Sequence, residues 1–309
     1  MFAYTFKRIL GMIPTLWLLL TLAFIVIHSA PGGPFSGERA LTPEIAASLA
    51  QKYHLNASLP QQYLAYLTNL MHGDLGPSLK YQDWTVNQLL ATGFPVSLKL
   101  GSVAMLIGVI FGIGLGSLAA LRKNHGLDYA VMGVALFGIS IPTFVTGPVM
   151  VLILGVFLRW LPVGGFQEGS VRDWVMPVIT LALPQIAVIA RMIRASLIEV
   201  LQSPYIRTAR AKGLSTFYIL TRHALRPALL PVISYLGPAM ASILTGSVVV
   251  EQIFGLPGVG SYLVKGALNR DYTLVLGTVI LVGTLMVWFN LLVDLLYAWI
   301  DPKIRYESQ

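Results

Sequence analysis

The chain has 309 residues, of which 56% are apolar and only 11% are charged. A soluble globular domain carries about 25% charged residues, so this chain has too little polar surface to face water on all sides. Its mean hydropathy of +0.74 agrees, and we predict a membrane protein. The sequence contains no cysteine, which excludes disulfides, a thiolate metal site and a cysteine nucleophile.

The net charge of +8 has two interpretations. A basic chain can bind nucleic acid or another anionic surface. In a membrane protein, however, lysine and arginine collect on the cytoplasmic side, and the excess reports topology. We therefore expect membrane lipid, and no nucleic acid, around this chain.

Six stretches are apolar and long enough to cross a bilayer, since about 20 helical residues span its core of about 30 Å. They are residues 9–27, 100–121, 130–158, 174–190, 228–250 and 274–300. The third is long enough to tilt and contains Pro142 and Pro148. The predicted fold class is an all-α polytopic membrane protein with six transmembrane helices.

The charges also predict the orientation of these spans. Most of the 21 lysines and arginines fall in segments that share a side with the N-terminus. The positive-inside rule then places both termini in the cytoplasm. The first span has a longer apolar stretch than the 7–15 residues of a signal peptide, so we expect it to remain in the protein.

The chain divides into three expected parts. Residues 1–30 form the N-terminal tail and first span, residues 31–99 an outer insertion, and residues 100–309 a five-helix core with a cytoplasmic loop at 191–227. Glycines at four-residue spacing in the second span, Gly108, Gly112 and Gly116, predict close helix packing.

The outer insertion is expected to hold two short helices. Pro43 and Glu44 suit the first turn of one helix, and residues 45–53 continue it with helical apolar spacing. A second apolar stripe runs from Tyr63 to Met71, before the breakers Gly73, Gly76 and Pro77. We expect a small helical cap, which either docks a soluble partner or covers the bundle as a structural lid.

No catalytic motif stands in the sequence. The five histidines are scattered, and there is no His-Glu-x-x-His pair and no Gly-x-Ser-x-Gly elbow. No Gly-Lys dipeptide occurs, so there is no phosphate-binding P-loop. We predict neither an enzyme nor a metal or cofactor site, and any ATP used in transport must bind another chain.

Two acidic residues fall in or near the spans. Asp294 lies in the sixth span, where a carboxylate is costly. It is either the coupling site of a proton-driven secondary transporter or a structural hydrogen-bonding group near the inner interface, and we favour the second. Glu251, at the outer end of the fifth span, is expected at the membrane interface.

The cytoplasmic loop has the signals of two short helices. Ser203 and Pro204 suit a helix start, and Gly213 suits a helix stop. Residues 214–220 then predict a second helix across the membrane surface. Such a knob fits a groove on a cytoplasmic partner, or is a basic loop held by anionic lipid headgroups.

This loop resembles the coupling loop of bacterial ABC importer permeases, in the dipeptide, oligopeptide and nickel branch. The family's general pattern starts Glu-Ala-Ala where this chain has Arg-Thr-Ala, a variant typical of that branch. Residues 251–260, 269–272 and 301–306 are similar to the branch too, and residues 35–56 to its oligopeptide permeases. The residues that carry the loop motif are Arg207, Thr208, Ala209, Arg210, Ala211, Lys212, Gly213 and Leu214.

The resemblance implies a type I ABC importer permease fold in the bacterial inner membrane. It also implies the partners: a homologous second permease subunit, two ATP-binding subunits, a periplasmic peptide-binding protein and a peptide substrate. Residues 207–214 would couple ATP hydrolysis by the partners to movement of the spans. Dipeptides, glutathione and nickel chelates stay open as alternative substrates. The third, fifth and sixth spans are the expected lining of the path.

Overall fold

The computed structural model describes residues 2–30, 33, 56–167 and 169–300, without the side chains of residues 2–9, 245–246 and 294–300. The first predicted helix of the insertion, the similarity at residues 35–55, the ending at 301–306 and the Asp294 side chain lie outside this description. Within it every regular element is a helix.

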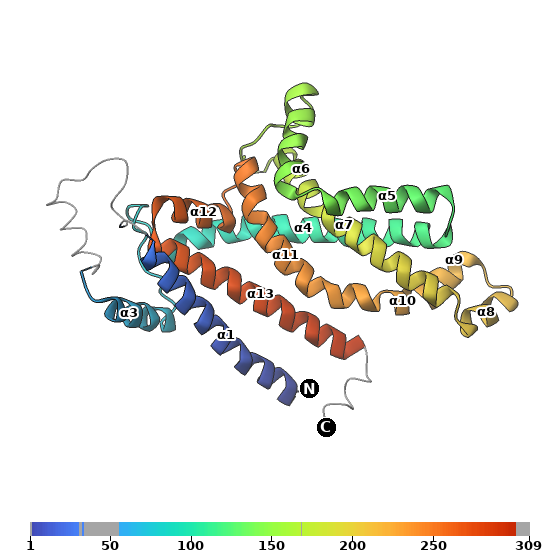
Figure 1. Ribbon diagram of the computed structural model, residues 1–309, viewed down its shortest axis with the longest axis horizontal. Coiled ribbons are helices and arrows are strands. Elements are labelled where there is room, and N and C mark those ends of the chain that lie inside the picture. The colour runs from blue at the N-terminus through green and yellow to red at the C-terminus, as the bar shows by residue number, and fades with distance from the viewer. Residues whose placement is uncertain (1, 31–32, 34–55, 168, 301–309) are drawn as a thin grey trace.

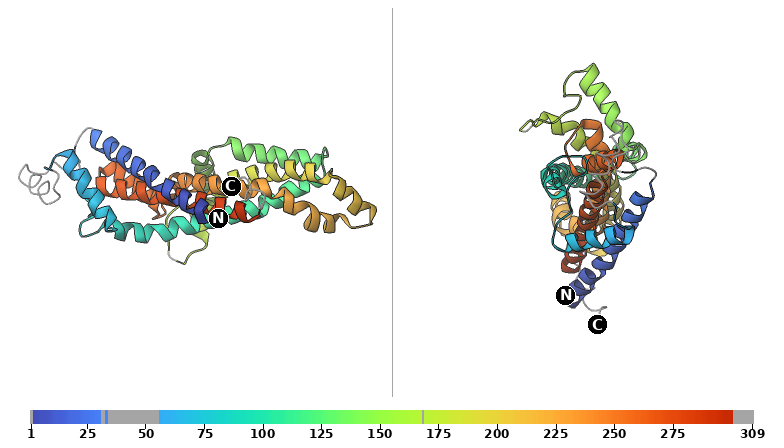
Figure 2. Two further views of the ribbon diagram at one scale, coloured as in Figure 1. Left: turned by 90° about the horizontal axis from the view of Figure 1, so that it is seen from below. Right: turned by 90° about the vertical axis from the view of Figure 1, so that its left-hand side faces the viewer.

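Five helices are long and apolar enough to cross a membrane, and a bent pair makes a possible sixth span. The five are α1 (Phe2–Ser29), α4 (Val86–Leu121), α7 (Arg172–Leu201), α11 (Leu230–Phe254) and α13 (Tyr272–Ile300). They correspond to the first, second, fourth, fifth and sixth predicted spans. The helices run lengthwise in an elongated bundle, with α1 beside α13 (Figures 1 and 2).

Several of the shorter helices lie at the two ends of this bundle (Figure 1). We call one end the cap end; it holds α3 (Leu59–Met71), the connection 72–85 and α12 (Val259–Asn269). At the other end, residues 203–228 form a projection that we call the knob. It contains α8 (Pro204–Ala211), α9 (Thr216–Tyr218), the wide-turn helix η2 (Ile219–Ala224) and α10 (Leu225–Ala228).

The third predicted span is broken and sharply bent rather than one continuous tilted helix. The chain forms α5 (Gly126–Ser140), then turns by 103° into α6 (Thr143–Met150) and the wide-turn helix η1 (Val151–Phe157). Pro142 causes the break, because it lacks an N–H donor and disfavours helical backbone at the residue before it. Accordingly Ile141 is extended, with ψ of 117°.

The pairing of α4 with α7 forms the most extensive contact of the bundle. A Cβ added at Gly108 would lie 2.8 Å from the Gln185 Cβ, and one at Gly116 would lie 2.5 Å from the Ala190 carbonyl oxygen. The glycine stripe therefore lets the two backbones approach, as the sequence predicts. The main buried cluster lies here, where Leu100, Met176 and Ile243 are among its fully covered side chains.

Substituting Gly116→Ala is expected to destabilise the bundle, because the new methyl group collides with backbone that cannot rotate away. Overpacking of this kind costs about 1–3 kcal/mol, or about 3 °C or more in melting temperature. The measurement is thermal unfolding of the purified protein in detergent. The matched control is Gly114→Ala, since a Cβ at Gly114 meets nothing within 4 Å; an equal effect of both variants would contradict the packing role.

Candidate functional site

The knob begins directly after α7. Ser203 occupies the position before α8, and Pro204 is its first residue, as the sequence predicts. The Ser203 hydroxyl does not cap α8 but donates to the Val200 carbonyl at 2.6 Å, back into the last turn of α7. This bond fixes the angle at which the chain leaves α7.

Gly213 terminates α8. Its φ of +75° lies in the left-handed region, where only glycine avoids a steric cost. The turn is closed by two backbone bonds, from the Gly213 N–H to the Arg210 carbonyl (2.9 Å) and from the Leu214 N–H to the Ala209 carbonyl (3.3 Å). The predicted helix stop at Gly213 is confirmed.

The eight motif residues come together on α8 and this turn, and all but one are exposed. Ala209 is buried with Ile206 against Leu197 of α7 and Ile219 of η2. The knob is therefore packed onto the end of α7 by a small apolar core. The exposed residues are Arg207, Thr208, Arg210, Ala211, Lys212, Gly213 and Leu214.

A second short helix follows the turn, as predicted. The Ser215 hydroxyl accepts from the Tyr218 N–H at 3.3 Å and starts α9. Sequence reasoning did not single out the exposed aromatic residues here: Phe217 is 75% exposed, and Tyr205 and Tyr218 are about half exposed. The sequence feature that could have identified them is the presence of large aromatic residues inside an otherwise basic loop.

The knob surface is positively charged. Arg207, Arg210, Lys212, Arg222 and Arg226 are exposed, and none forms an ion pair within the described part of the chain. Exposed cations around aromatic side chains suit the surface of a soluble partner better than hydrocarbon, because such a patch combines apolar anchors with a charged rim.

A partly buried ion pair lies near the knob end of the bundle. Arg194 of α7 donates through Nε to Asp128 Oδ1 at 2.5 Å and through a terminal nitrogen to Asp128 Oδ2 at 2.7 Å. Asp128 is in the first turn of α5 and is buried. The two-pronged geometry joins α5 to α7 in a fixed register.

At the cap end, Glu251 is buried inside the protein, where the sequence had suggested an interfacial position. Its carboxylate accepts from the Ser97 hydroxyl at 2.7 Å and from the Ser261 N–H at 3.0 Å. A Cβ on Gly258 would collide with this carboxyl group, so glycine is required there. Glu251 thus joins α11 to α4 and α12.

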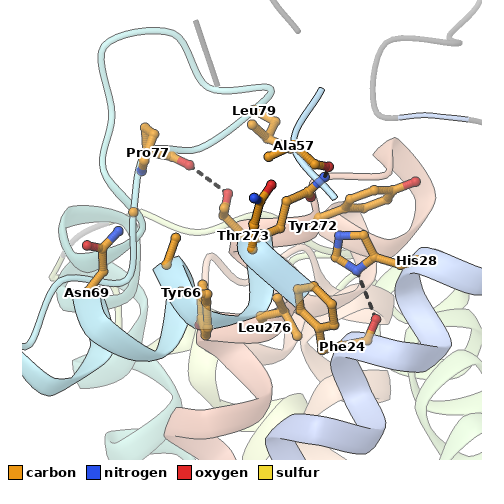
Figure 3. A pocket seen from close by; sticks show the side chains of 14 residues that line it. Phe24, His28, Ala57, Tyr66, Asn69, Pro77, Leu79, Tyr272, Thr273 and Leu276 are labelled. Atoms are coloured by element: carbon orange, nitrogen blue, oxygen red, sulfur yellow. Dashed lines mark hydrogen bonds between the residues drawn. The ribbon is translucent and has the colours of Figure 1, made fainter. Parts of the chain in front are cut away.

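A second buried carboxylate anchors the cap to α13. Asp271 accepts from the Leu274 N–H at 3.1 Å and from the Ser78 hydroxyl, and thereby caps the start of α13. Beside it the Thr273 hydroxyl donates to the Pro77 carbonyl at 2.6 Å (Figure 3). These bonds hold the connection 72–85 on the end of the last span.

A cavity of about 240 Å³ lies between α1, α3 and the start of α13 (Figure 3). Phe24, Tyr66 and Leu276 give it mainly apolar walls, and His28 Nδ1 donates to the Phe24 carbonyl at 2.9 Å. Burial raises the pKa of the Tyr66 hydroxyl, for which the described residues provide no hydrogen-bond partner.

Comparison with known proteins gives a consistent result. Residues 112–306 match the family model described as binding-protein-dependent transport system inner membrane component. The chain is 54% identical over 306 residues to the oligopeptide transport system permease protein OppB of Haemophilus influenzae, covering 99% of this chain and 100% of that protein. It is 43% identical over 306 residues to the dipeptide transport system permease protein DppB of Bacillus subtilis, covering 99% of both.

The fold is similar to that of a solved ABC transporter. A chain of the inward-facing MetNI methionine ABC transporter matches with a TM-score of 0.57 and 19% identity, covering 69% of this chain and 96% of that one. At this identity the likeness concerns the fold alone.

Substituting Glu251→Ala is expected to loosen the cap end, because the Ser97 hydroxyl and the Ser261 N–H lose their acceptor inside the protein. Each orphaned donor costs about 1–3 kcal/mol, so the melting temperature should fall by about 5 °C or more. Thermal unfolding in detergent is the measurement, with the exposed Glu199→Ala as control. Equal melting temperatures for the two variants would contradict a structural role of the Glu251 carboxylate.

Proposed function

Because the chain belongs to the family of binding-protein-dependent transport system inner membrane components, we propose that it is one of two permease subunits of an ATP-driven oligopeptide importer. The family predicted from the cytoplasmic loop is thereby confirmed. The substrate proposal rests on the 54% identity to permeases named for oligopeptide transport, against 43% for a dipeptide permease.

The observation that carries this proposal is the knob. The chain has no P-loop with which to bind nucleotide. Its knob instead presents a basic and aromatic surface that is packed onto the end of a long transmembrane helix. Such a surface suits docking of an ATP-binding subunit, one on this chain and one on the homologous second permease.

The packing of the knob suggests how movement of the ATP-binding subunits is passed to the transmembrane helices. Ile206 and Ala209 lie in one buried cluster with Leu197 of α7 and with Ala228 at the end of α10, just before α11. A push on α8 therefore displaces two spans together. We infer that nucleotide-driven movement of the ATP-binding subunits switches the spans between two packings, open to one side and then to the other. No covalent chemistry is assigned to this chain.

The proposed orientation places the knob and both termini in the cytoplasm. The cap end then faces the periplasm, where a binding protein would deliver peptide. The excess of lysine and arginine on the knob side of the spans supports this arrangement. The cap, fixed by Glu251 and Asp271, would be a rigid surface for that delivery.

Substituting Gly213→Asp is expected to abolish binding of the ATP-binding subunits and leave membrane insertion intact. The variant adds a side chain and a negative charge on the knob at a left-handed backbone position. Co-purification of the ATP-binding subunits is the measurement. The matched control is Gly73→Asp at the cap end, whose φ of +76° imposes the same backbone strain.

Normal co-purification and peptide uptake with Gly213→Asp would contradict the coupling role. Peptide transport by this chain alone in vesicles would contradict the importer itself.

Substituting Phe217→Ala is expected to weaken this docking, because Phe217 is the most exposed aromatic side chain of the knob. An anchor residue of this kind contributes about 2 kcal/mol, or about thirtyfold in affinity. The affinity of the purified permease pair for the ATP-binding subunit is measured directly. Val171→Ala, equally exposed at 76% but outside the knob, is the control and should have no effect.

A further inference from the structure

The bend between α5 and α6 leaves polar backbone without partners. We call residues 138–143 the elbow. The carbonyl oxygens of Gly138, Ile139, Ser140 and Ile141 accept no hydrogen bond from any described residue, and the Ser140 hydroxyl has no partner there either. The last carbonyls of any helix lack intrahelical donors, and here Pro142 removes the N–H that would have reached Gly138.

The elbow packs beside the middle of the apolar stretch of α7. Gly138 is packed on α7: an added Cβ would lie 3.4 Å from the Leu183 carbonyl oxygen and 3.3 Å from the Ala187 Cβ. Leu183 is near the centre of the apolar stretch 174–190, about 10–14 Å from either end at about 1.5 Å per residue. In Figure 1 α5 ends beside the middle of α7, and α6 departs sideways from the bundle.

Lipid cannot cover such a site. Hydrocarbon offers no donor, and non-helical backbone at this depth is found only where it is buried in protein or lines a water-filled cavity. This chain does not bury the elbow, since Ser140, Ile141 and Pro142 are all exposed. At a similar level on α4, the exposed residues Leu106 and Ile110 are large and apolar. The elbow therefore faces water or another polypeptide.

We propose that the elbow lines the aqueous translocation path and is a subsite for the peptide backbone, an inference that rests on the proposed import of peptides. Every peptide carries N–H donors and an N-terminal ammonium group, which are complementary to clustered carbonyl oxygens. The C-terminal end of α5 adds a partial negative charge that favours the ammonium group. In other transporters the unwound carbonyls and helix C-terminal ends of broken helices near the midplane coordinate cations.

This chemistry also matches a broad substrate range. Backbone carbonyls recognise what all peptides share and do not read their side chains. A subsite made of carbonyls and one hydroxyl would hold peptides loosely and release them. No charged side chain occurs from Gly138 to Leu158, so nothing at the elbow or along α6 and η1 selects acidic or basic peptides.

The test uses the absence of cysteine from this chain. Single variants Ser140→Cys and Leu106→Cys are prepared in the complete importer in proteoliposomes and exposed to a charged, water-soluble thiol reagent. Leu106 is the depth-matched control, because it is 58% exposed and two residues from Gly108, which contacts Gln185 of α7. Ser140→Cys should react at least tenfold faster, and trialanine with its binding protein and ATP should slow that reaction severalfold.

Two results would overturn the subsite. One is reactivity of Ser140→Cys as low as that of Leu106→Cys. The other is a disulfide between Ser140→Cys and a cysteine placed on the second permease, with no labelling from water, which would make the elbow a subunit interface. Uptake of trialanine by the unmodified importer is measured alongside. If that uptake occurs, either result counts against the subsite and not against the proposed function.

A second variant tests the carbonyls themselves. Pro142→Ala restores an N–H that can bond to Gly138 and lets α5 continue, so uptake of trialanine should fall at least tenfold while the ATP-binding subunits still co-purify. Pro148→Ala, within α6 and away from the elbow, is the control. Uptake at the wild-type rate by the Pro142→Ala importer would refute the subsite. If this variant does not assemble with its partner subunits, the cysteine-labelling experiment decides.

Discussion

Hydrocarbon offers no hydrogen bonds, so every backbone N–H and C=O at membrane depth needs a partner within the protein or in enclosed water. This constraint explains why the described spans are long continuous helices. It also explains why the backbone can leave the helical conformation only where other groups form hydrogen bonds with its freed N–H and C=O groups. At the ends of the bundle that partner is a side chain. At the elbow no described residue supplies one for the carbonyl groups of residues 138–141.

The same constraint explains the buried carboxylates at the cap end. The turn from α11 into α12 leaves backbone donors inside the protein, and Glu251 accepts from one of them at Ser261. The start of α13 leaves others, and Asp271 accepts from Leu274. An acid that hydrophobicity alone would disfavour is therefore stabilised by donors that would otherwise be unpaired. The acids fix the cap because they complete the backbone's bonds.

Local signals in the sequence predict much of this structure. Apolar length predicts six spans, of which five are single helices in the structure. Ser203, Pro204 and Gly213 predict α8 and its end, because caps and turns depend on neighbouring residues. The right-angled elbow is not predictable in this way: a proline in a span indicates a bend, and its angle depends on how α6 packs on α7 and α11. Likewise the burial of Glu251 depends on Ser97, which is 154 residues distant in the sequence.

In the proposed importer, one helix relates the knob to the elbow. The knob packs on α7 at Leu197, and the elbow packs on the same helix near Leu183, fourteen residues or about 21 Å away. Between them the Arg194–Asp128 pair fixes α5 to α7. A displacement of the knob that moves α7 must therefore carry the elbow with it. Force applied at the knob would then change the position of the elbow carbonyls, although the sequence contains no P-loop.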